Sequence, residues 1–349
     1  MSAESASLVG CVVGGRYKVV ELIGAGAMGQ VYAADGKSGE DVALKVLHAK
    51  AAEDPDLVAR FQREAEIASR IQSPYVASVL GAGKDRNGRL WIAFERLHGE
   101  GLDVRVRREQ YLSFAEVAPI VHDTLRGLEA AHAAGIIHRD IKPANLFIEK
   151  RKPSSDRASE YEHDERTRIL DFGVSKLRGR GRKDSSLTAF DATLGSFAYM
   201  APEQVRGSAR ADARADLYAL GAVAFRLLTG RLPFEGTSAL TLIALKLDRE
   251  APSLATATGD TWPAALERML AQMMARDRDR RFANTVEALQ AWHEVCKVMG
   301  DLPRRGPPKS GVPIDTLEDD VHRTYGTTGG TLSSTFNDGG PSAVRRLKT

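Results

Sequence analysis

His-Arg-Asp-Ile-Lys-Pro-Ala-Asn, at residues 138–145, places a carboxylate (Asp140), an ammonium (Lys142) and an amide (Asn145) in one short loop. A carboxylate can take a proton from a hydroxyl, an ammonium can neutralise a phosphate, and an amide oxygen can help to hold a metal ion. The loop alone is a weak indication, because this chemistry needs further groups from elsewhere in the chain. The rest of the sequence contains them, in order.

A glycine-rich stretch, Gly-Ala-Gly-Ala-Met-Gly-Gln-Val, occupies residues 24–31. Glycines allow a strand–turn–strand backbone to approach phosphate oxygens closely. The same spacing occurs in dinucleotide-binding turns, which require a helix directly after the glycines. Residues 30–46 instead continue as two strands around a glycine-containing turn. The pattern therefore favours a hairpin that covers phosphates.

Lys45 ends the apolar run Val-Ala-Leu-Lys. Such a lysine either extends to solvent from an edge strand or is a buried ammonium that needs partners. Its place just beyond a glycine hairpin suits a contact with the α- and β-phosphates of a nucleotide. Glu64, on an expected helix, is the predicted partner. Glu66 is the competitor, but it is rotated by about 200° on that helix.

Two further motifs follow the loop of residues 138–145. Asp-Phe-Gly at residues 171–173 comes after an apolar pair, and a strand ending in Asp171 would deliver a carboxylate to a hard metal ion. Asn145 and Asp171 are therefore the candidate Mg²⁺ pair. Ala-Pro-Glu at residues 201–203 is followed later by Arg281, and a buried Glu–Arg pair could lock the helical part of the chain.

The hydrophobic pattern predicts an α+β fold of two lobes. Residues 17–94 contain strand-like runs around one helix at roughly residues 55–71, which indicates a small antiparallel sheet with one packed helix. Residues 102–298 are dominated by helical periods, and Gly135 and Gly230 are the expected ends of two helices. Residues 95–101 would connect the lobes as a hinge.

Three stretches depart from this globular pattern. Residues 1–16 are expected to be a flexible leader. Residues from about 149 to 168 are highly charged and are predicted to be a solvated insertion at a hairpin tip, with partner docking as the alternative. Residues 299–349 are rich in Gly, Pro, Ser and Thr and are expected to be a disordered tail. This tail is either an inert linker or a carrier of phosphosites for phosphothreonine-binding partners: Thr316, Thr324, Thr327 and Thr328.

Composition excludes several classes of protein. The chain is 43% hydrophobic and 27% charged, with a net charge of +3, which is ordinary for a globular protein and too small to indicate nucleic acid. Basic residues 178–183 lack the interleaved aromatics of a nucleic-acid patch. Two distant cysteines, Cys11 and Cys296, fit a reducing compartment. With neither a secretory signal nor a long apolar run, we expect a cytoplasmic protein outside the membrane. The oligomeric state stays open, with a transient homodimer as one alternative.

Taken in order, these motifs resemble those of protein kinases, from about residue 17 to residue 298. HRDIKPAN, DFGVSKL and GSFAYMAPEQ are most similar to the eukaryotic-like Ser/Thr kinases of bacteria. The resemblance implies a bilobal kinase fold and ATP-dependent phosphorylation of Ser and Thr in protein substrates. Two alternatives are a pseudokinase scaffold, which would be expected to lack Lys45, Asp140 or Asp171, and a small-molecule phosphotransferase, which would not normally carry the Ala-Pro-Glu segment.

The resemblance also implies a role for each motif residue. Asp140 would orient and deprotonate the substrate hydroxyl, and Lys142 would neutralise the γ-phosphate. Asn145 and Asp171 would hold Mg²⁺, and Lys45, paired with Glu64, would contact ATP. The other residues implied to bind the nucleotide, with Phe94 as gatekeeper, are Ile23, Gly24, Ala25, Gly26, Ala27, Met28, Gly29, Gln30, Val31, Ala43, Phe94, Glu95, Leu97 and Phe147.

Arg139, beside Asp140, indicates control by phosphorylation. The segment between Asp171 and Glu203 contains several Ser and Thr residues, of which Thr188 and Thr193 are the favoured phosphosites. A phosphate there could pair with Arg139 and order the segment. The alternative is a loop that happens to contain hydroxyl residues. We expect autophosphorylation at one of the two threonines.

Overall fold

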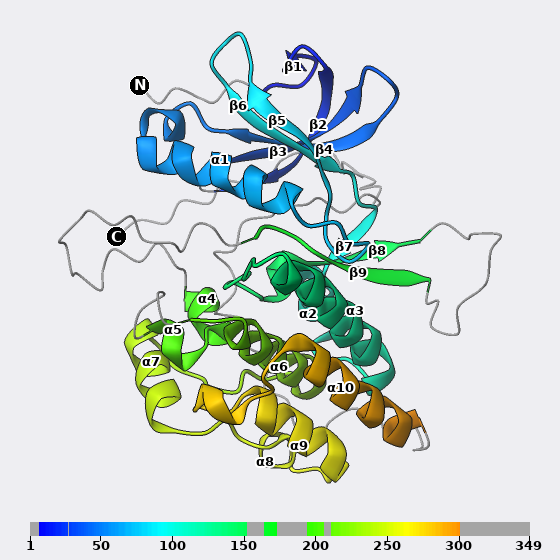
Figure 1. Cartoon of the computed structure of the whole chain (residues 1–349), viewed down its shortest axis with the longest axis vertical. Coiled ribbons are helices and arrows are strands. Elements are labelled where there is room, and N and C mark those ends of the chain that lie inside the picture. Colours follow the sequence, from blue (N-terminus) through cyan, green and yellow to red (C-terminus); the bar gives the residue numbers. More distant parts are fainter. Residues whose placement is uncertain (1–6, 27, 152–163, 173–193, 206–210, 301–349) are drawn as a thin grey trace, which may run out of the picture.

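The computed structural model describes residues 7–26, 28–151, 164–172, 194–205 and 211–300. Figure 1 shows two lobes, a smaller N-lobe with a sheet and one helix above a mainly helical C-lobe. This is the two-lobed α+β arrangement that the sequence predicts. Thr188, Thr193, most of the charged insertion and residues 301–349 of the expected tail lie outside the described residues.

The N-lobe is built on a six-stranded antiparallel sheet. Its strands are β1 (Val12–Val13), β2 (Tyr17–Ala25), β3 (Gly29–Gly36), β4 (Asp41–Leu47), β5 (Val79–Lys84) and β6 (Leu90–Glu95). They lie in the order β1-β2-β3-β4-β6-β5. Helix α1 (Pro55–Ser69) begins after Asp54, whose carboxylate accepts hydrogen bonds from the first-turn amides. Phe61 and Ala65 of α1 pack into the same buried cluster as Ile92 of β6.

The sheet contains two strands that the sequence analysis misses. Residues 7–16 are described, and Val12 and Val13 form β1 against β2, so this part of the expected leader belongs to the sheet. A strand of two residues is too short to show a period. In β5, Gly81 and Gly83 lack β-propensity, and a Cβ at Gly83 would lie only 3.0 Å from the ring of Trp91.

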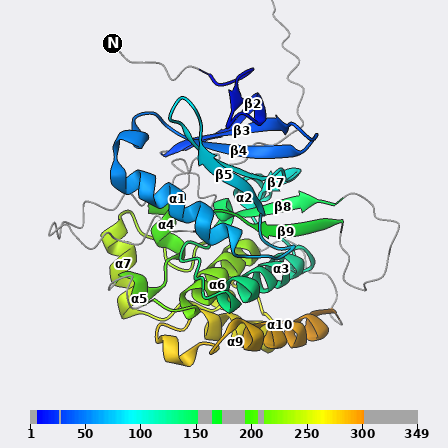
Figure 2. The ribbon, with the colours of Figure 1, turned by 45° about the horizontal axis from the view of Figure 1, so that its top comes forward.

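The C-lobe surrounds one buried helix, α6 (Arg214–Thr229), whose residues from Ala215 onward are all buried. Helices α3 (Phe114–Ala133) and α9 (Ala264–Met273) pack on α6, and α10 (Thr285–Gly300) packs on both of them (Figure 2). Both predicted helix ends are present as left-handed glycines, Gly135 at φ 73° and Gly230 at φ 72°. The remaining helices are α2 (Leu102–Glu109), α4 (Leu194–Tyr199), α5 (Pro202–Val205), α7 (Ala239–Asp248) and α8 (Leu254–Thr258). No helix among the described residues has the length and apolar character needed to cross a membrane.

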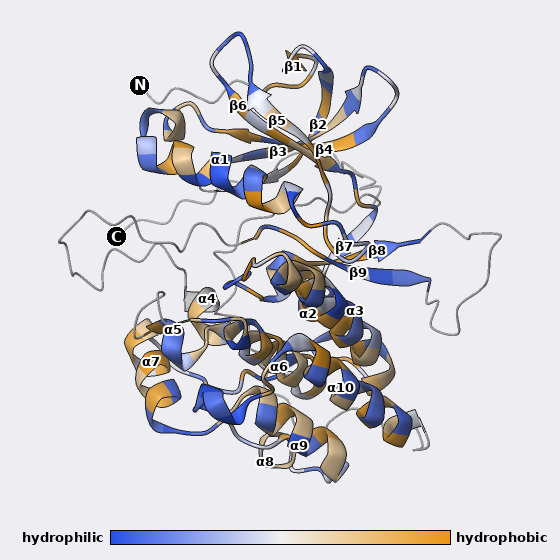
Figure 3. Cartoon of the chain, viewed as in Figure 1, coloured by the Kyte–Doolittle hydropathy of each residue, from blue (hydrophilic) through white to orange (hydrophobic). Residues whose placement is uncertain are grey.

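A second sheet lies at the boundary between the lobes. It consists of β7 (Gly99–Gly101), β8 (Leu146–Lys150) and β9 (Glu165–Ile169), and β8 and β9 pair as a hairpin that includes both ends of the predicted charged insertion. Figure 3 shows hydrophilic residues along the outer part of this hairpin. The expectation that the whole charged stretch is solvated is wrong at Thr167 and Arg168, which are buried. Arg168 tolerates burial because two carboxylates and a carbonyl surround its guanidinium.

Candidate active site

The ammonium of Lys45 lies between two carboxylates from different elements. Lys45 projects from β4, and its Nζ is 2.6 Å from Glu64 Oε1 on α1 and 3.1 Å from Asp171 Oδ1, just after β9. Glu64, rather than Glu66, is therefore the glutamate that contacts Lys45. The three side chains join the N-lobe sheet, its helix and the end of the β8–β9 hairpin.

Burial and charge act in opposite directions on this ammonium. Burial by itself lowers the pKa of Lys45, but the carboxylates of Asp171 and Glu64 outweigh it, so that the pKa lies above its ordinary value. For Glu64, burial is the largest effect and raises the pKa of the carboxyl; Asp171 acts in the same direction and Lys45 opposes it. Lys45 therefore remains charged at neutral pH.

The loop of residues 138–145 brings its three polar groups together. Lys142 Nζ is 3.1 Å from Asp140 Oδ2. A 3-10 turn at residues 143–145 directs the Asn145 amide toward Asp140, where Nδ2 donates to the backbone oxygen at 2.7 Å and lies 3.3 Å from Oδ2. The Asp140 carboxylate is thus flanked by an ammonium and an amide, which suits acceptance of a proton beside a phosphate.

A buried aspartate of α6 fixes the backbone of this loop. Asp216 Oδ2 accepts a hydrogen bond from His138 N at 2.9 Å, and Oδ1 accepts one from Arg139 N at 2.7 Å. His132 Nε2 lies 2.8 Å from the same carboxylate. These contacts hold Arg139 at φ 65°, a left-handed conformation that is rare outside glycine. Burial lowers the pKa of His138, whose ring packs against Phe172 with centroids 4.8 Å apart.

Asn145 and Asp171 are tied together through the backbone, because Leu170 N donates to Asn145 O at 2.9 Å. The Asn145 side-chain nitrogen donates to Asp140, so the amide oxygen is the atom that could serve as a metal donor together with the Asp171 carboxylate. Two hard oxygen donors fit Mg²⁺, which completes its shell with water and phosphate oxygens. Within the described residues, no group of three or more His, Cys, Asp or Glu could hold a metal ion by itself. A metal at this pair would therefore depend on ligand oxygens.

The residues implied to surround adenine fall into two apolar clusters. The N-lobe cluster contains Val31, Ala43 and Phe94, with Ile23 and Met28 packed against it. The second cluster, at the lobe boundary, contains Leu97 and Phe147 together with Ala77 and Leu170. The predicted adenine-contacting residues therefore lie in two places, the N-lobe sheet on one side and the hinge with the β8–β9 hairpin on the other.

The glycine-rich stretch forms the end of the β2–β3 hairpin. Residues 24 and 25 pair with residues 31 and 30, and Gly26 N donates to Gly29 O at 2.8 Å. The sequence motif suggests that these glycines let the backbone approach phosphates, but packing against the neighbouring strand also requires a glycine at position 29. A Cβ there would lie 2.3 Å from Val46 O on the neighbouring strand. Ala27 lies outside the described residues.

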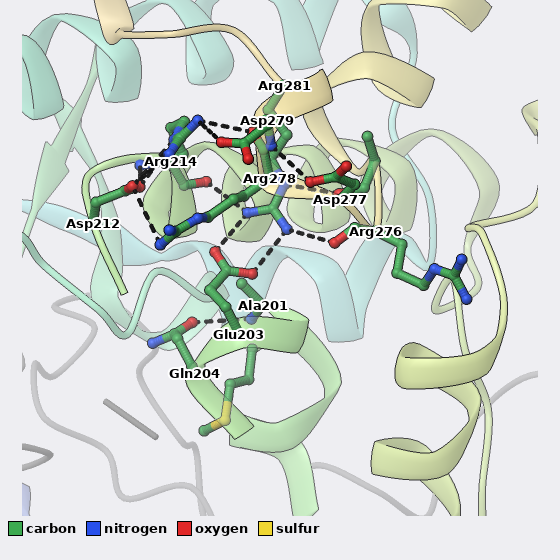
Figure 4. Close-up of polar contacts among 12 residues, drawn as sticks. Ala201, Glu203, Gln204, Asp212, Arg214, Arg276, Asp277, Arg278, Asp279 and Arg281 are labelled. Atoms are coloured by element: carbon green, nitrogen blue, oxygen red, sulfur yellow. Dashed lines mark hydrogen bonds and ion pairs between the residues drawn. The ribbon is translucent and has the colours of Figure 1, made fainter. Parts of the chain in front are cut away.

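The predicted lock of the helical lobe is present. Arg281 Nη1 and Nη2 lie 2.7 and 2.9 Å from the two carboxylate oxygens of Glu203 (Figure 4). The Arg281 side chain is fully buried and also donates to Ala275 O and Arg214 O. This pair fixes α5 to the start of α6.

Two polar side chains that sequence reasoning misses hold the residues just before α5. Gln204 Nε2 donates to Arg139 O at 2.9 Å, while its Oε1 accepts from Ala201 N. Lys246, buried on α7, donates to the backbone oxygens of Ala198 and Met200 at 2.7 and 2.9 Å. A single Gln or Lys in a helical pattern carries no spacing signal, so only the tertiary contacts reveal these roles.

Comparison with known families decides the identity of this arrangement. The sequence profile of the protein kinase domain matches residues 17–294. The chain belongs to this family. The matched range contains both lobes, the loop of residues 138–145 and the Glu203–Arg281 pair.

Several bacterial protein kinases are similar in sequence. Serine/threonine-protein kinase pkn3 of Myxococcus xanthus is 37% identical over 310 residues, which are 87% of this chain and 55% of that protein. PknJ of Mycobacterium tuberculosis is 35% identical over 79% of this chain and 44% of its own length. PrkC of Bacillus subtilis is 32% identical over 81% of this chain and 41% of its own length. The chain therefore spans about half the length of these relatives.

A solved kinase domain has the same fold. The crystal structure of the Mycobacterium tuberculosis PknI kinase domain superposes with a TM-score of 0.60 at 30% identity. The alignment covers 83% of this chain and 99% of that domain.

Proposed function

We propose that this chain transfers the γ-phosphoryl group of ATP to serine and threonine hydroxyls of proteins. One observation carries the proposal: Lys45 joins Glu64 and Asp171 while Asp140, Lys142 and Asn145 meet in the adjoining loop. Phosphoryl transfer needs an ammonium for the phosphates, a metal-binding pair and a carboxylate for the hydroxyl. The serine/threonine kinase names of the relatives support the same reaction.

Each group has a separate task in the proposed mechanism. Lys45 binds the nucleotide phosphates, and its contact with Glu64 keeps the ammonium in place. The Asp140 carboxylate orients the acceptor hydroxyl and takes its proton, while Lys142 balances charge on the transferred group. Asn145 and Asp171 would hold Mg²⁺, which neutralises phosphate charge when bound. Catalysis is then mainly positioning and electrostatic stabilisation.

Labelled-phosphate transfer from ATP to myelin basic protein tests this proposal. Asp140→Asn should lower kcat by about a hundredfold or more, since the variant loses the proton acceptor but keeps the shape of the side chain. Lys45→Met should lose most activity through weaker phosphate binding. Full activity in Asp140→Asn would contradict the proposed role. Transfer to small metabolites but not to protein would favour the small-molecule phosphotransferase instead.

We further propose that phosphorylation at Thr188 or Thr193 regulates this activity. A cavity of about 570 Å³ between α1 and the start of the loop of residues 138–145 is lined by three arginines, Arg63, Arg70 and Arg139. Arg139 Nε is buried with no hydrogen-bond partner among the described residues. Glu66 lines the cavity as well, but the arginines outnumber it. A phosphate here would link α1, which carries Glu64, to the loop of Asp140.

Mass spectrometry after incubation with Mg-ATP should find phosphate between Asp171 and Glu203. Arg139→Gln should abolish the increase in activity that accompanies this modification and leave the unphosphorylated enzyme unchanged. Finding no phosphate in that segment would contradict autophosphorylation. A phosphate that activates Arg139→Gln as strongly as the wild type would contradict the pairing.

We infer a cytoplasmic location, because the proposed reaction uses ATP and the two cysteines are unpaired. Protein substrates, and phosphothreonine-binding partners of the tail threonines, are the proposed partners. Cell fractionation tests the location. Affinity capture with phosphorylated and unphosphorylated tail peptides tests the partners, since only the phosphorylated peptide should retain them.

A further inference from the structure

A buried arginine lies behind the hinge and takes no part in the chemistry above. Arg168, on β9, is 5% exposed. Its Nη2 donates to Glu95 Oε1, at the start of the hinge, and to Val76 O at 2.9 Å. Its Nη1 donates to Glu149 Oε2, on β8, at 2.8 Å. One guanidinium therefore contacts the N-lobe, the hinge and the β8–β9 hairpin.

The hinge residue in this cluster is held from a second direction. Ser78 N donates to Glu95 Oε1 at 2.7 Å, and Glu95 N donates to Ser78 O at 3.0 Å. Glu95 thus has its backbone in the sheet and its carboxylate turned toward Arg168. The position of the hinge backbone at this residue depends on both contacts.

The β8–β9 hairpin also supplies part of the lower apolar cluster. Phe147 stands directly opposite Arg168 in the register of the two strands, so their side chains lie on the same face. Phe147 packs with Leu97 of the hinge and with Leu170. Arg168 consequently fixes the hinge at Glu95 relative to the hairpin whose Phe147 packs under the hinge at Leu97.

Stability alone is a weak reason for this cluster. A buried ion pair loses hydration of both charges, and apolar residues of similar volume often serve the fold as well. The guanidinium contributes a geometric constraint, because its planar fork fixes two carboxylates and a carbonyl in one arrangement. Positioning is therefore the function that the contacts support.

We propose that Arg168 is a positioning residue of the nucleotide site, which holds the hinge against the β8–β9 hairpin and so sets the affinity for ATP without touching it. The proposal rests on the proposed nucleotide site at the hinge. Removing Arg168 leaves the Glu95 carboxylate with the Ser78 amide but without its charged partner, and loosens the hinge backbone that would meet adenine. Binding then has to order the hinge, which lowers affinity more than it lowers the rate at saturating ATP.

Fluorescence titration with mant-ADP and Mg²⁺, competed with ATP, measures this effect. Wild type should bind both nucleotides. Arg168→Met should raise both dissociation constants about tenfold, within the range expected for coupling through contacts outside a site. Its kcat at saturating ATP should fall less than about threefold. Arg168→Lys should recover part of the affinity, because an ammonium can still reach one carboxylate.

A second variant tests whether the loss of affinity comes only from misfolding around a carboxylate that has lost its charged partner. Glu95→Gln combined with Arg168→Met removes the stranded hinge carboxylate and should bind nucleotide as weakly as Arg168→Met alone. The matched control is Arg105→Met, since Arg105 pairs with Glu165 of the same hairpin at 2.7 Å and with Glu100 at 2.8 Å. This control loosens the hairpin at Glu165 and the far end of the hinge at Glu100, away from Glu95, and should leave both dissociation constants within about twofold.

The outcomes separate the two proposals. A wild-type chain that binds neither nucleotide would overturn the proposed function itself. Wild-type binding together with unchanged or tighter binding by Arg168→Met would overturn the role of Arg168. An equal loss of affinity in Arg105→Met would also overturn it, because general loosening of the hairpin would then explain the effect.

Discussion

Lys246 is the most completely buried charged side chain that meets no carboxylate among the described residues. Its ammonium donates to the carbonyls of Ala198 and Met200 and lies 5.1 Å from the ring centroid of Tyr218. Burial lowers the pKa of Lys246 to about 7, and the nearby guanidinium of Arg281 acts in the same direction. The folded protein therefore holds this proton much less tightly than the unfolded chain does.

The sign of the resulting pH dependence follows from proton uptake. Between pH 7 and about pH 10 the unfolded chain holds a proton on Lys246 that the folded chain has lost, so stability from this residue rises with pH. Compared with Lys246→Met, the wild type should gain on the order of 2 kcal/mol in free energy of unfolding from pH 7 to pH 9. Urea denaturation of both proteins measures this difference. A difference that stays constant over the range would contradict the burial of a titrating amine.

The contact between α3 and β9 requires a glycine at position 127. A Cβ there would lie 2.7 Å from Ile169 Cδ1 and 3.0 Å from Tyr75 O. Gly127→Ala should destabilise the fold by about 1–3 kcal/mol in urea denaturation, although alanine favours helices. Adding Ile169→Val removes the crowded methyl group and should recover part of the loss. A more stable Gly127→Ala protein would show that α3 can move away without cost.

The β8–β9 hairpin should close without the charged insertion. Arg151 N donates to Asp164 O at 2.8 Å, so the strands already meet at the positions where the described residues end. Replacing residues 152–163 by Asn-Gly supplies a two-residue hairpin turn. The free energy of unfolding should change by less than about 1 kcal/mol, and ATP affinity should be unchanged. Loss of folding, or of nucleotide binding, would show that the insertion has a structural role.

Sequence patterns predict the long elements because their periods and stop signals are local. Helices α3 and α6 end where Gly135 and Gly230 take left-handed conformations, and α1 lies within the range expected from its helical period. Strand β1 is missed because two residues show no period. The burial of Arg168 is missed because its partners, Glu95 and Val76, are distant in the chain.

The same distinction between local patterns and long-range contacts applies to the predicted site. Asp140, Lys142 and Asn145 meet because they share one loop, and the Lys45–Glu64 contact follows from strand and helix geometry. Local patterns do not predict the distant residues that hold this loop in place. Asp216 reaches it from α6, and no local pattern specifies which distant carboxylate will accept the two loop amides.

At the scale of the whole molecule, the nucleotide would join groups from both lobes. Lys45 belongs to the N-lobe sheet, while Asn145 and Asp171 lie on the C-lobe side and Lys45 already bridges to Asp171. A ligand that binds only when the lobes are correctly placed stabilises the folded chain as a unit. The two lobes should therefore respond together to nucleotide and metal.

Thermal unfolding with AMP-PNP, which is not turned over, tests this coupling. At about 100 times Kd the complex gains about 2.7 kcal/mol, which corresponds to a rise in Tm of roughly 4–6 °C for a domain of this size. Because Asn145 and Asp171 would hold Mg²⁺ against the phosphates, EDTA should remove most of the rise, and Asp171→Asn should lose the same part even with Mg²⁺ present. Asp164→Asn, at the far end of the hairpin, is the control and should keep the full shift. An equal shift with and without EDTA would show that nucleotide binds without metal at this pair. If unfolding occurred in two separate transitions and only one of them shifted, the lobes would unfold independently.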